Sequence, residues 1–274
     1  MTNRIAFVGG GNMATGLIGG LIARGTPPAE IVVADPEAAQ RSRLERDYGV
    51  TTVTDAPAAV VGARTVVLAV KPQQMAQVAR SIARQVAASH ALVISVAAGI
   101  RLQDLARWLG PGVRLIRTMP NRPALIGAGI TALYAMAEVD ASSRQTAETI
   151  LAACGPTVWV PDESQLDVVT AVSGSGPAYF FLLIECLEAA GIQLGLDPVT
   201  ARKLAVETAR GSGRMAAEAS EPPAELRAQV TSKGGTTAAA LEVLEAAGVR
   251  GIFAAAVAAG ARRSTELAQE FGTL

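Results

Sequence analysis

Short apolar runs and helical patterns alternate along the first part of the chain. The apolar run of residues 5–8 ends at three glycines, and apolar residues then recur with helical spacing over residues 13–24. The alternation continues, with strands expected at 31–34, 65–70, 91–96, 113–117, 129–134 and 157–160, and helices at 37–48, 73–88 and 102–109. Strands that alternate with helices imply parallel pairing with right-handed crossovers. We therefore expect an α/β fold, a doubly wound Rossmann-type parallel sheet, in a dinucleotide-binding domain over residues 1–161.

The pattern changes after Pro161 and Asp162, because every later segment has helical period and no strand pattern follows. We expect a second, all-helical domain over residues 162–274, serving dimerisation and substrate binding. Residues 237–247 and 252–261 are rich in alanine on more than one helical face, which favours helices from two chains packing together. A monomeric helical bundle is the alternative interpretation.

Composition argues against several classes of protein. The 24 Lys and Arg residues balance 24 Asp and Glu residues, so no basic excess favours nucleic acid or anionic lipid. The longest apolar stretches are shorter than the roughly 20 residues that span a bilayer, and glycines interrupt the apolar run near the N-terminus. We expect no nucleic-acid partner, no membrane span and a cytoplasmic location.

The cysteines and the histidine offer little chemistry. Cys154 and Cys186 have neither a disulfide framework nor a metal-ligand spacing, so we interpret both as structural and expect no metal site. His90, the single histidine, lies in a polar stretch before an apolar run, which favours a solvated loop residue. A histidine-centred triad or zinc site is therefore disfavoured.

A glycine fingerprint follows the first expected strand. In this context Gly9 permits a tight turn, Gly11 lets the backbone approach a pyrophosphate, and Ala14 lets the helix pack closely on the strand. The helix N-terminus offers free N–H groups to the phosphates. The candidate cofactor residues of this segment are Val8, Gly9, Gly10, Gly11, Asn12, Met13 and Ala14. A glycine-rich turn without a ligand is the alternative.

Asp35 ends the second expected strand. Its carboxylate can bind the ribose hydroxyls of NAD and would repel the 2′-phosphate of NADP. It can equally serve as the N-cap of the next helix. Arg41, Arg43 and Arg46 follow and either contact phosphate or form a solvated face, so the choice between NAD and NADP stays open.

Two further segments end apolar strands at the edge where α/β sheets bind ligands. They supply the candidate cofactor residues Ala69, Val70, Lys71, Pro72, Val96, Ala97 and Ala98. Small side chains there let a flat cofactor approach the backbone. Lys71 either contacts the cofactor or is solvated.

In the helical part, residues 231–237 place glycines and threonines at a helix start. Such a segment offers N–H groups suited to a carboxylate, together with hydroxyls that can donate a hydrogen bond. Plain N-capping is the alternative interpretation.

Taken together, these motifs resemble those of the pyrroline-5-carboxylate reductase family over essentially the whole chain. The resemblance rests on Gly9-Gly10-Gly11-Asn12-Met13-Ala14, Ala69-Val70-Lys71-Pro72, Ala97-Ala98-Gly99, Met119-Pro120-Asn121, Ser173-Gly174-Ser175-Gly176-Pro177-Ala178-Tyr179 and Gly234-Gly235-Thr236-Thr237. It implies hydride transfer from NADPH or NADH to the C=N carbon of 1-pyrroline-5-carboxylate, giving L-proline in the last step of proline biosynthesis.

The resemblance also implies residue roles. Thr237 is the expected catalytic residue, hydrogen-bonded to the imine nitrogen, while Gln229 and Asn121 join the cofactor residues. The backbone of Ser232, Gly235, Thr236 and Thr237 is expected to hold the substrate carboxylate. The family forms homodimers through its helical domain, and the dimers assemble into larger homo-oligomers.

Three positions depart from the family pattern. Lys233 stands where the family usually has proline, Arg122 where it has threonine, and Ala56 where NADP-using relatives often have asparagine. Lys233 either strengthens carboxylate binding or loosens a turn, and Ala56 with Asp35 makes NADH use more plausible.

Two alternative functions follow. One is a related cyclic imine or β-hydroxyacid reductase; a hydroxyacid enzyme would use a lysine of the helical domain, Lys203 or Lys233, as proton donor. A dinucleotide-sensing module without catalysis would leave residues 231–237 unexplained.

Overall fold

The computed structural model describes residues 4–273. The chain forms two compact units, one comprising the residues up to Gly174 together with those from Ala259 onward, the other comprising Ser175–Ala258. The sequence predicts a single boundary after residue 161, whereas the chain crosses between the compact units twice. Residues 162–174 and the end of the chain belong to the first unit because Leu166 and Ala268 are buried there.

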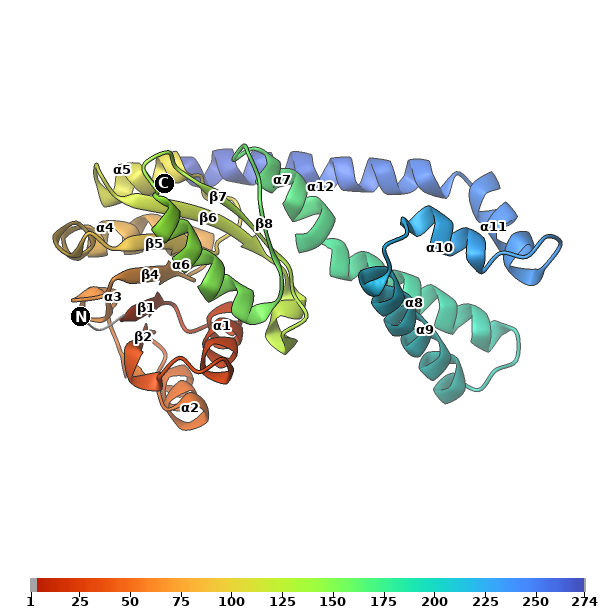
Figure 1. Ribbon diagram of the computed structural model, residues 1–274, viewed down its shortest axis with the longest axis horizontal. Helices are drawn as coiled ribbons and strands as arrows, with labels where there is room; N and C mark the ends of the chain where they lie inside the picture. The colour runs from red at the N-terminus through yellow and green to blue at the C-terminus, as the bar shows by residue number, and fades with distance from the viewer. Residues whose placement is uncertain (1–3, 274) are drawn as a thin grey trace. The chain divides into compact units, whose positions relative to one another are not determined.

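The first unit is built on an eight-stranded sheet of order β3-β2-β1-β4-β5-β6-β7-β8 (Figure 1). Its strands are β1 (Ile5–Val8), β2 (Ile31–Ala34), β3 (Thr51–Val53), β4 (Thr65–Leu68), β5 (Leu92–Ser95), β6 (Arg114–Pro120), β7 (Thr131–Ala135) and β8 (Thr157–Trp159). β1 to β6 pair in parallel, which confirms the doubly wound arrangement.

The expectation of a wholly parallel sheet is wrong at β7, which is antiparallel to β6. Only a short 3₁₀ helix, η2 (Arg122–Ile126), lies between these strands, and a parallel crossover needs a dozen or more residues. β8 then runs parallel to β7 and forms the sheet edge. β3 was not predicted from the sequence, since Thr51 and Thr52 give no apolar run.

Helices cover both faces of this sheet. The α-helices of the first unit are α1 (Asn12–Ala23), α2 (Ala38–Tyr48), α3 (Ala56–Val60), α4 (Pro72–Ser89), α5 (Leu102–Leu109), α6 (Ala141–Leu151) and α7 (Gln165–Val169). One core cluster joins α1, α2 and α6 to one face, and a second joins α3, α4 and α5 to the other. Along β1, Ile5 and Phe7 enter the first cluster while Ala6 and Val8 enter the second.

The remaining short elements are the 3₁₀ helices η1 (Pro28–Glu30) and η3 (Ala152–Cys154), and a π-helix, η4 (Thr170–Gly174), directly after α7. α3 and α6 are further elements that the sequence pattern did not predict. Their N-caps, Asp55 and Asp140, accept hydrogen bonds from the N–H groups of Ala58 and Ser143.

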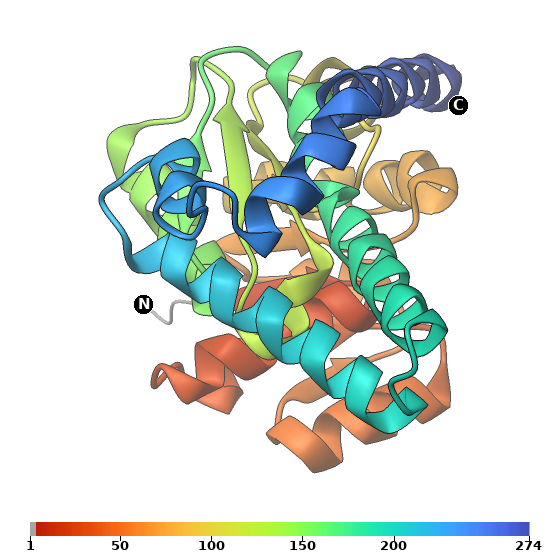
Figure 2. The ribbon, with the colours of Figure 1, turned by 90° about the vertical axis from the view of Figure 1, so that its right-hand side faces the viewer.

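The second unit is entirely helical, as the sequence predicts. It contains α8 (Gly176–Gln193), α9 (Pro198–Glu218), α10 (Pro223–Gln229), α11 (Thr236–Ala246) and the first part of α12 (Val249–Gly272). α8 and α9 form a helical hairpin (Figure 2). Asp197 caps α9, and hydrogen bonds from Thr200 hold the pKa of its carboxyl below the ordinary value of 3.8.

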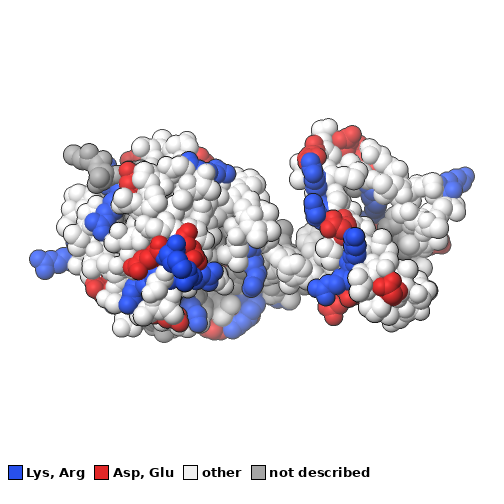
Figure 3. All heavy atoms as spheres, turned by 90° about the horizontal axis from the view of Figure 1, so that it is seen from below, with Lys and Arg blue, Asp and Glu red and all other residues white. Residues whose placement is uncertain are grey.

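Helices of the second unit bury few apolar side chains within one chain. Among residues 175–258, all of which the structure describes, Ala201 and Ala205 are the buried hydrophobic residues. Large residues such as Phe180, Phe181 and Leu182 are exposed. On the face shown in Figure 3, basic and acidic side chains lie interspersed and not in a patch of one sign.

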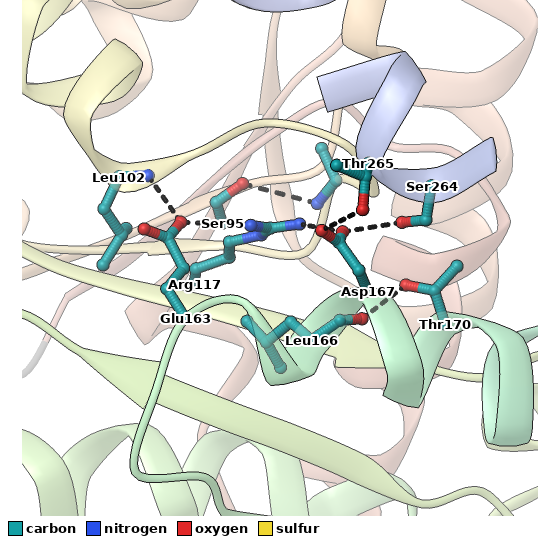
Figure 4. Close-up of polar contacts among 10 residues, drawn as sticks. Ser95, Leu102, Arg117, Glu163, Leu166, Asp167, Thr170, Ser264 and Thr265 are labelled. Atoms are coloured by element: carbon teal, nitrogen blue, oxygen red, sulfur yellow. Dashed lines mark hydrogen bonds and ion pairs between the residues drawn. The ribbon is translucent and has the colours of Figure 1, made fainter. Parts of the chain in front are cut away.

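A buried polar cluster ties distant segments of the first unit together (Figure 4). Arg117 on β6 lies 3.1 Å from Glu163 and 3.5 Å from Asp167, and its side chain is only 4% exposed. The Glu163 carboxylate also accepts a hydrogen bond from the N–H of Leu102 at the start of α5. Asp167 accepts one hydrogen bond from Ser264 and one from Thr265, both on α12, which holds the end of this helix in the first unit.

Candidate functional site

The glycine turn after β1 brings the ends of two strands close together. Gly9 has φ +97°, a left-handed conformation that favours glycine. A Cβ at Gly9 would lie 2.7 Å from the carbonyl oxygen of Ala69. The N–H of Gly9 donates to Ala34, and that of Ala69 donates to Val8. The turn therefore sits where β1, β2 and β4 end side by side.

The start of α1 is open and suited to a phosphate. Gly11 is its N-cap, with no side-chain hydrogen bond to the first turn and no atom within 4 Å of where a Cβ would be. The first N–H groups of a helix need partners and carry partial positive charge. Ala14 is fully buried and lets α1 pack closely on the sheet. These residues fit a dinucleotide pyrophosphate.

The carboxylate of Asp35 is bound to the glycine turn. One oxygen accepts a 2.8 Å hydrogen bond from the N–H of Gly10, and the other a 2.9 Å bond from the N–H of Glu37. Asp35 is not the N-cap of α2, because Glu37 holds that position, so the capping alternative is wrong. Asp35 instead fixes the end of β2 against the turn.

Two further side chains, Gln40 and Thr15, bind the glycine turn beside Asp35, and neither role was predicted from the sequence. Gln40 donates from its amide to the carbonyl oxygen of Gly10, and Thr15 donates to the same oxygen at 3.2 Å. No motif signals these roles, because both depend on tertiary proximity.

Among the arginines of α2, only one points to this edge. The Arg41 guanidinium donates to the carbonyl oxygens of Asp35 and Pro36, at 2.8 and 2.9 Å. Arg43 and Arg46 form ion pairs with Asp47, which fits a solvated face.

The other predicted cofactor residues of the first unit lie along the same carboxyl edge. Lys71 is the N-cap of α4 without a side-chain hydrogen bond to the helix, and Pro72 begins that helix. The N–H of Val96 donates to Leu68, which joins the ends of β4 and β5. Asn121 follows β6 and accepts a hydrogen bond from the N–H of Ile130. The structure thus brings together Val8, Gly9, Gly10, Gly11, Asn12, Met13, Ala14, Asp35, Ala69, Val70, Lys71, Pro72, Val96, Ala97, Ala98 and Asn121 at the edge where open α/β sheets bind ligands.

A second helix start with a glycine N-cap lies in the second unit. Gly235 caps α11 without a side-chain hydrogen bond, and Gly234 has φ +69°. The N–H of Gly235 donates to the carbonyl oxygen of Ser232, which closes the turn. Thr236 and Thr237 are the first residues of the helix. This helix start leaves backbone N–H groups that suit a carboxylate, and the two threonines that follow carry hydroxyls.

Gln229 ends α10, just before this turn. Ser232 and Lys233 are exposed, while Thr237 is half-buried. The five predicted residues Gln229, Ser232, Gly235, Thr236 and Thr237 all belong to the second unit, whereas the other cofactor residues belong to the first.

The two cysteines and the histidine belong neither to the candidate cofactor residues at the sheet edge nor to the residues at the start of α11. Cys154 is buried, and desolvation raises the pKa of its thiol, whereas Cys186 is exposed. His90 is exposed at the C-cap of α4 with φ 49°, which confirms the solvated position. Within residues 4–273, no group of three or more His, Cys, Asp or Glu side chains is placed to hold a metal ion.

One long helical segment is apolar enough to be compared with a membrane span. In the described part of the chain, residues 165–193 have the length and composition of a span, with 17% of the most apolar window buried, and α11 with α12 pass the same test only as a bent pair. The sequence pattern predicted no apolar stretch of that length, and this segment differs because α7, η4 and α8 follow one another without a long break. Helices of a protein interface have the same composition, so this finding alone is weak support for a membrane.

Family models match both parts of the chain. The model described as pyrroline-5-carboxylate reductase dimerisation matches residues 163–267. The model described as NADP oxidoreductase coenzyme F420-dependent matches residues 4–99.

Full-length relatives carry the same name. The chain is 45% identical to pyrroline-5-carboxylate reductase of Pseudomonas aeruginosa, over 99% of both chains. It is 42% identical to the enzyme of Pasteurella multocida, over 97% of this chain and 98% of that one.

Two solved structures share the fold along nearly the whole chain. A pyrroline-5-carboxylate reductase from Coxiella burnetii matches with TM-score 0.94 and 40% identity, covering 97% of this chain and 99% of that one. The pyrroline carboxylate reductase of Plasmodium falciparum, solved with NADP bound, matches with TM-score 0.85 and 26% identity, covering 98% and 99%.

Proposed function

Because this chain belongs to the pyrroline-5-carboxylate reductase family, we propose the roles by which its residues reduce 1-pyrroline-5-carboxylate to L-proline. The chain is an NAD(P)-dependent oxidoreductase of proline biosynthesis. One observation supports the residue roles most strongly: both α1 and α11 begin at a glycine N-cap that leaves the first-turn N–H groups without a side-chain partner. Each helix start suits one anionic group, the cofactor pyrophosphate or the substrate carboxylate.

The carboxyl edge of the first unit holds the cofactor in this proposal. The turn at Gly9, Gly10 and Gly11 binds the pyrophosphate, and Asp35 and Arg41 lie at the ribose end. Bound NADPH or NADH supplies a hydride, which is the chemistry that side chains lack. The small residues Ala69, Ala97 and Ala98 let the cofactor approach the backbone.

The start of α11 orients the substrate. The backbone of Ser232, Gly235, Thr236 and Thr237 binds the carboxylate, and the Thr237 hydroxyl hydrogen-bonds the ring nitrogen. A hydride from the bound cofactor would form the new C–H bond at the imine carbon as the C=N π bond breaks, and the nitrogen would take one proton from solvent to become a secondary amine. Orientation of the imine against the hydride donor is the protein's main contribution. The resemblance to the family assigns Gln229 to the nicotinamide end of the cofactor, and this role is part of the proposal.

A related cyclic imine reductase is the second candidate, and Lys233 favours it. This lysine replaces the usual proline beside the proposed carboxylate site, so it changes both the charge and the stiffness of the turn. A longer ring would be accommodated most easily if that turn were looser.

The protein is a homo-oligomer with a dimerisation domain. Assembly of dimers into larger rings and a cytoplasmic location are further parts of the proposal. The exposed apolar residues of α8, including Phe180 and Phe181, support subunit contacts as the reason for the apolar character of residues 165–193.

A steady-state assay tests the proposed function. Purified protein is given 1-pyrroline-5-carboxylate with NADPH or NADH in parallel, and L-proline is measured by chromatography. We expect one proline for each nicotinamide oxidised. Oxidation of neither nicotinamide would contradict the proposal, and faster turnover of the six-membered-ring imine acid would favour the second candidate.

A further inference from the structure

The last turn of α12 packs on the segment that follows β5. Gly99 in this segment has φ +72°, and a Cβ there would lie 3.1 Å from the ring of Phe271 and 3.7 Å from Leu267. Any side chain at this position would therefore be both strained and crowded. Gly99 is buried, whereas Ala98 before it is exposed. The ring of Phe271 thus lies directly on the backbone beside one of the candidate cofactor residues.

Polar contacts hold Gly272, the residue after Phe271, against α5. The Arg107 guanidinium donates a 2.6 Å hydrogen bond to the carbonyl oxygen of Gly272 and lies 3.0 Å from the Asp104 carboxylate. The Asp104 side chain is only 5% exposed, and a Cβ on Gly272 would lie 2.9 Å from its carboxylate. A glycine on each side of the contact, at 99 and at 272, therefore lets the end of α12 approach this region closely.

The rest of the first unit holds the two ends of the same segment. The N–H of Ala97 donates to the hydroxyl of Ser95 at 3.4 Å, and the N–H of Leu102 donates to the carboxylate of Glu163 at 2.8 Å (Figure 4). Phe271 contacts the middle of the segment, between these two bonds. The conformation of residues 97–102 therefore depends on contacts from β5, from the loop before α7 and from the end of α12.

Phe271 is far from the cofactor motifs in sequence and has no role in the proposed function. It lies outside both segments that match family models, residues 4–99 and 163–267. Its half-buried ring packs on the core cluster beneath α3, α4 and α5. Core packing alone would explain the burial of the ring. The contact with Gly99 adds a link to the carboxyl edge of the sheet, where the cofactor is expected.

We propose that Phe271 is a positioning residue for the cofactor, which acts by holding the backbone at Gly99. The inference rests on the cofactor roles of Ala97 and Ala98 in the proposed function. Packing of the ring on Gly99 keeps the preceding backbone in one conformation before the dinucleotide binds. A segment that is already ordered loses less conformational entropy on binding, so the affinity for the cofactor is higher. The end of α12 therefore supports the site without supplying a group that contacts the dinucleotide.

Substitution of the ring tests this role. Phe271→Ala removes the contact with Gly99, and Val86→Ala is the matched control, since Val86 is buried in the same core cluster at the opposite end of α4 from Lys71. Both substitutions should lower the unfolding temperature, because both remove apolar side-chain volume from this core. We expect the NADPH Kd to rise about fivefold or more in Phe271→Ala and to stay unchanged in Val86→Ala. NADPH fluorescence titration and thermal unfolding give the two values, at a concentration where sedimentation shows the same assembly for all the proteins.

Kinetics and a conservative substitution separate positioning from a general loss of stability. In Phe271→Ala the KM for NADPH should rise while kcat at saturating NADPH stays the same, since the bound cofactor restores the order of the segment. Phe271→Leu keeps an apolar side chain on Gly99 and should recover most of the affinity. If Phe271→Ala does not fold, Phe271→Val makes the same comparison with Val86→Ala.

Hydrogen exchange of the cofactor-free protein measures the order of the segment directly. The amides of residues 97–101 should exchange about fivefold faster or more in Phe271→Ala than in the unchanged protein, with no such difference in Val86→Ala.

An unchanged NADPH Kd in folded Phe271→Ala would overturn the inference, as would an equal rise in Val86→Ala or unchanged exchange at residues 97–101. Each of these results would leave the proposed reductase standing, because the proline assay tests the reaction separately. Binding of neither nicotinamide by the unchanged protein would overturn both the inference and the proposed cofactor roles.

Discussion

Ser264 donates a 2.7 Å hydrogen bond to the carboxylate of Asp167, 97 residues earlier in the chain. Thr265 donates to the same carboxylate at 3.0 Å, and Arg117 faces it at 3.5 Å. Because Arg117, Asp167 and Ser264 are buried, each depends on the others for its polar partners. The Ser264–Asp167 hydrogen bond therefore joins α12 to α7, and the Arg117 guanidinium on β6 faces the same carboxylate.

Removing a side chain from the cluster of Arg117, Asp167 and Ser264 should destabilise the protein. The loss should be larger when a buried charge loses its charged partner than when only a neutral donor is removed. Asp167→Ala leaves the Arg117 guanidinium with Glu163 alone, and we expect a loss of about 3 kcal/mol in the free energy of unfolding. Ser264→Ala removes one donor, for an expected loss of about 1 kcal/mol. Urea unfolding at one fixed protein concentration measures both. Equal effects of the two substitutions would show that Arg117 does not need Asp167.

The glycines of the turn after β1 should respond differently to alanine. Gly11 has φ −62° and open space at its Cβ position, so Gly11→Ala should fold without strain, at a cost of about 1 kcal/mol or less because alanine is a poorer N-cap than glycine. The added methyl group should block the cofactor, raising the NADPH Kd about tenfold or more, which corresponds to about 1.4 kcal/mol. Fluorescence titration and thermal unfolding give the two values. Tight NADPH binding by a folded Gly11→Ala variant would rule out pyrophosphate binding at this turn.

Gly9→Ala is the contrasting substitution. Its φ of +97° and the 2.7 Å approach to Ala69 strain any side chain, at a cost of about 1–3 kcal/mol or more. We expect a lower unfolding temperature than in Gly11→Ala. If the two variants unfold at the same temperature, the close approach of β1 and β4 does not require glycine.

Thr237 should affect turnover more than binding. If its hydroxyl hydrogen-bonds the imine nitrogen, Thr237→Ala should lower kcat about 10²-fold, while the backbone N–H groups of α11 still bind the carboxylate. Thr237→Ser keeps the hydroxyl and should recover most of the rate. Steady-state kinetics with 1-pyrroline-5-carboxylate separates kcat from KM. A Thr237→Ala variant with normal kcat would remove this residue from the catalytic step.

Asp35 should influence the choice of cofactor. Asp35→Asn keeps a side-chain oxygen for the N–H of Gly10 but removes the negative charge near the ribose end. Relief of about 1 kcal/mol of repulsion toward the 2′-phosphate should raise the preference for NADPH over NADH several-fold. The measurement is the ratio of kcat/KM for the two cofactors. Asp55→Asn, at the N-cap of α3, is the matched control and should leave the ratio unchanged.

Asp140 should make the free energy of unfolding depend on pH. Hydrogen bonds from Ser143 hold the pKa of the Asp140 carboxyl below its ordinary value of 3.8. Its contribution is therefore present above about pH 3.8 and is lost as pH falls through the lower folded-state pKa. Asp140→Ser keeps an N-cap without a titrating group. The urea midpoint of the unchanged protein should fall more steeply below about pH 4 than that of Asp140→Ser, and parallel curves would contradict the assignment.

The sequence alone was informative wherever structure depends on near neighbours. The strand, glycine turn and helix of residues 5–23 follow from a short apolar run, three glycines and helical spacing, all within a few turns of one another. The helical nature of residues 176–272 follows from periodicity in the same way. The roles of Asn121, Gln229 and Thr237 stay predictions, because they depend on bound molecules.

Tertiary structure decided what depends on distant partners. β7 reverses because the connection after β6 is too short for a crossover, and α3, α6 and β3 form although their segments show little periodicity of their own. Asp35, which the sequence left as a possible helix cap, binds the N–H of Gly10 because the fold places the end of β2 beside the glycine turn. Arg117 is buried on β6 only because Glu163 and Asp167 reach it. Periodicity determines which face of an element is apolar, but packing in three dimensions determines which elements meet and which charges find a partner.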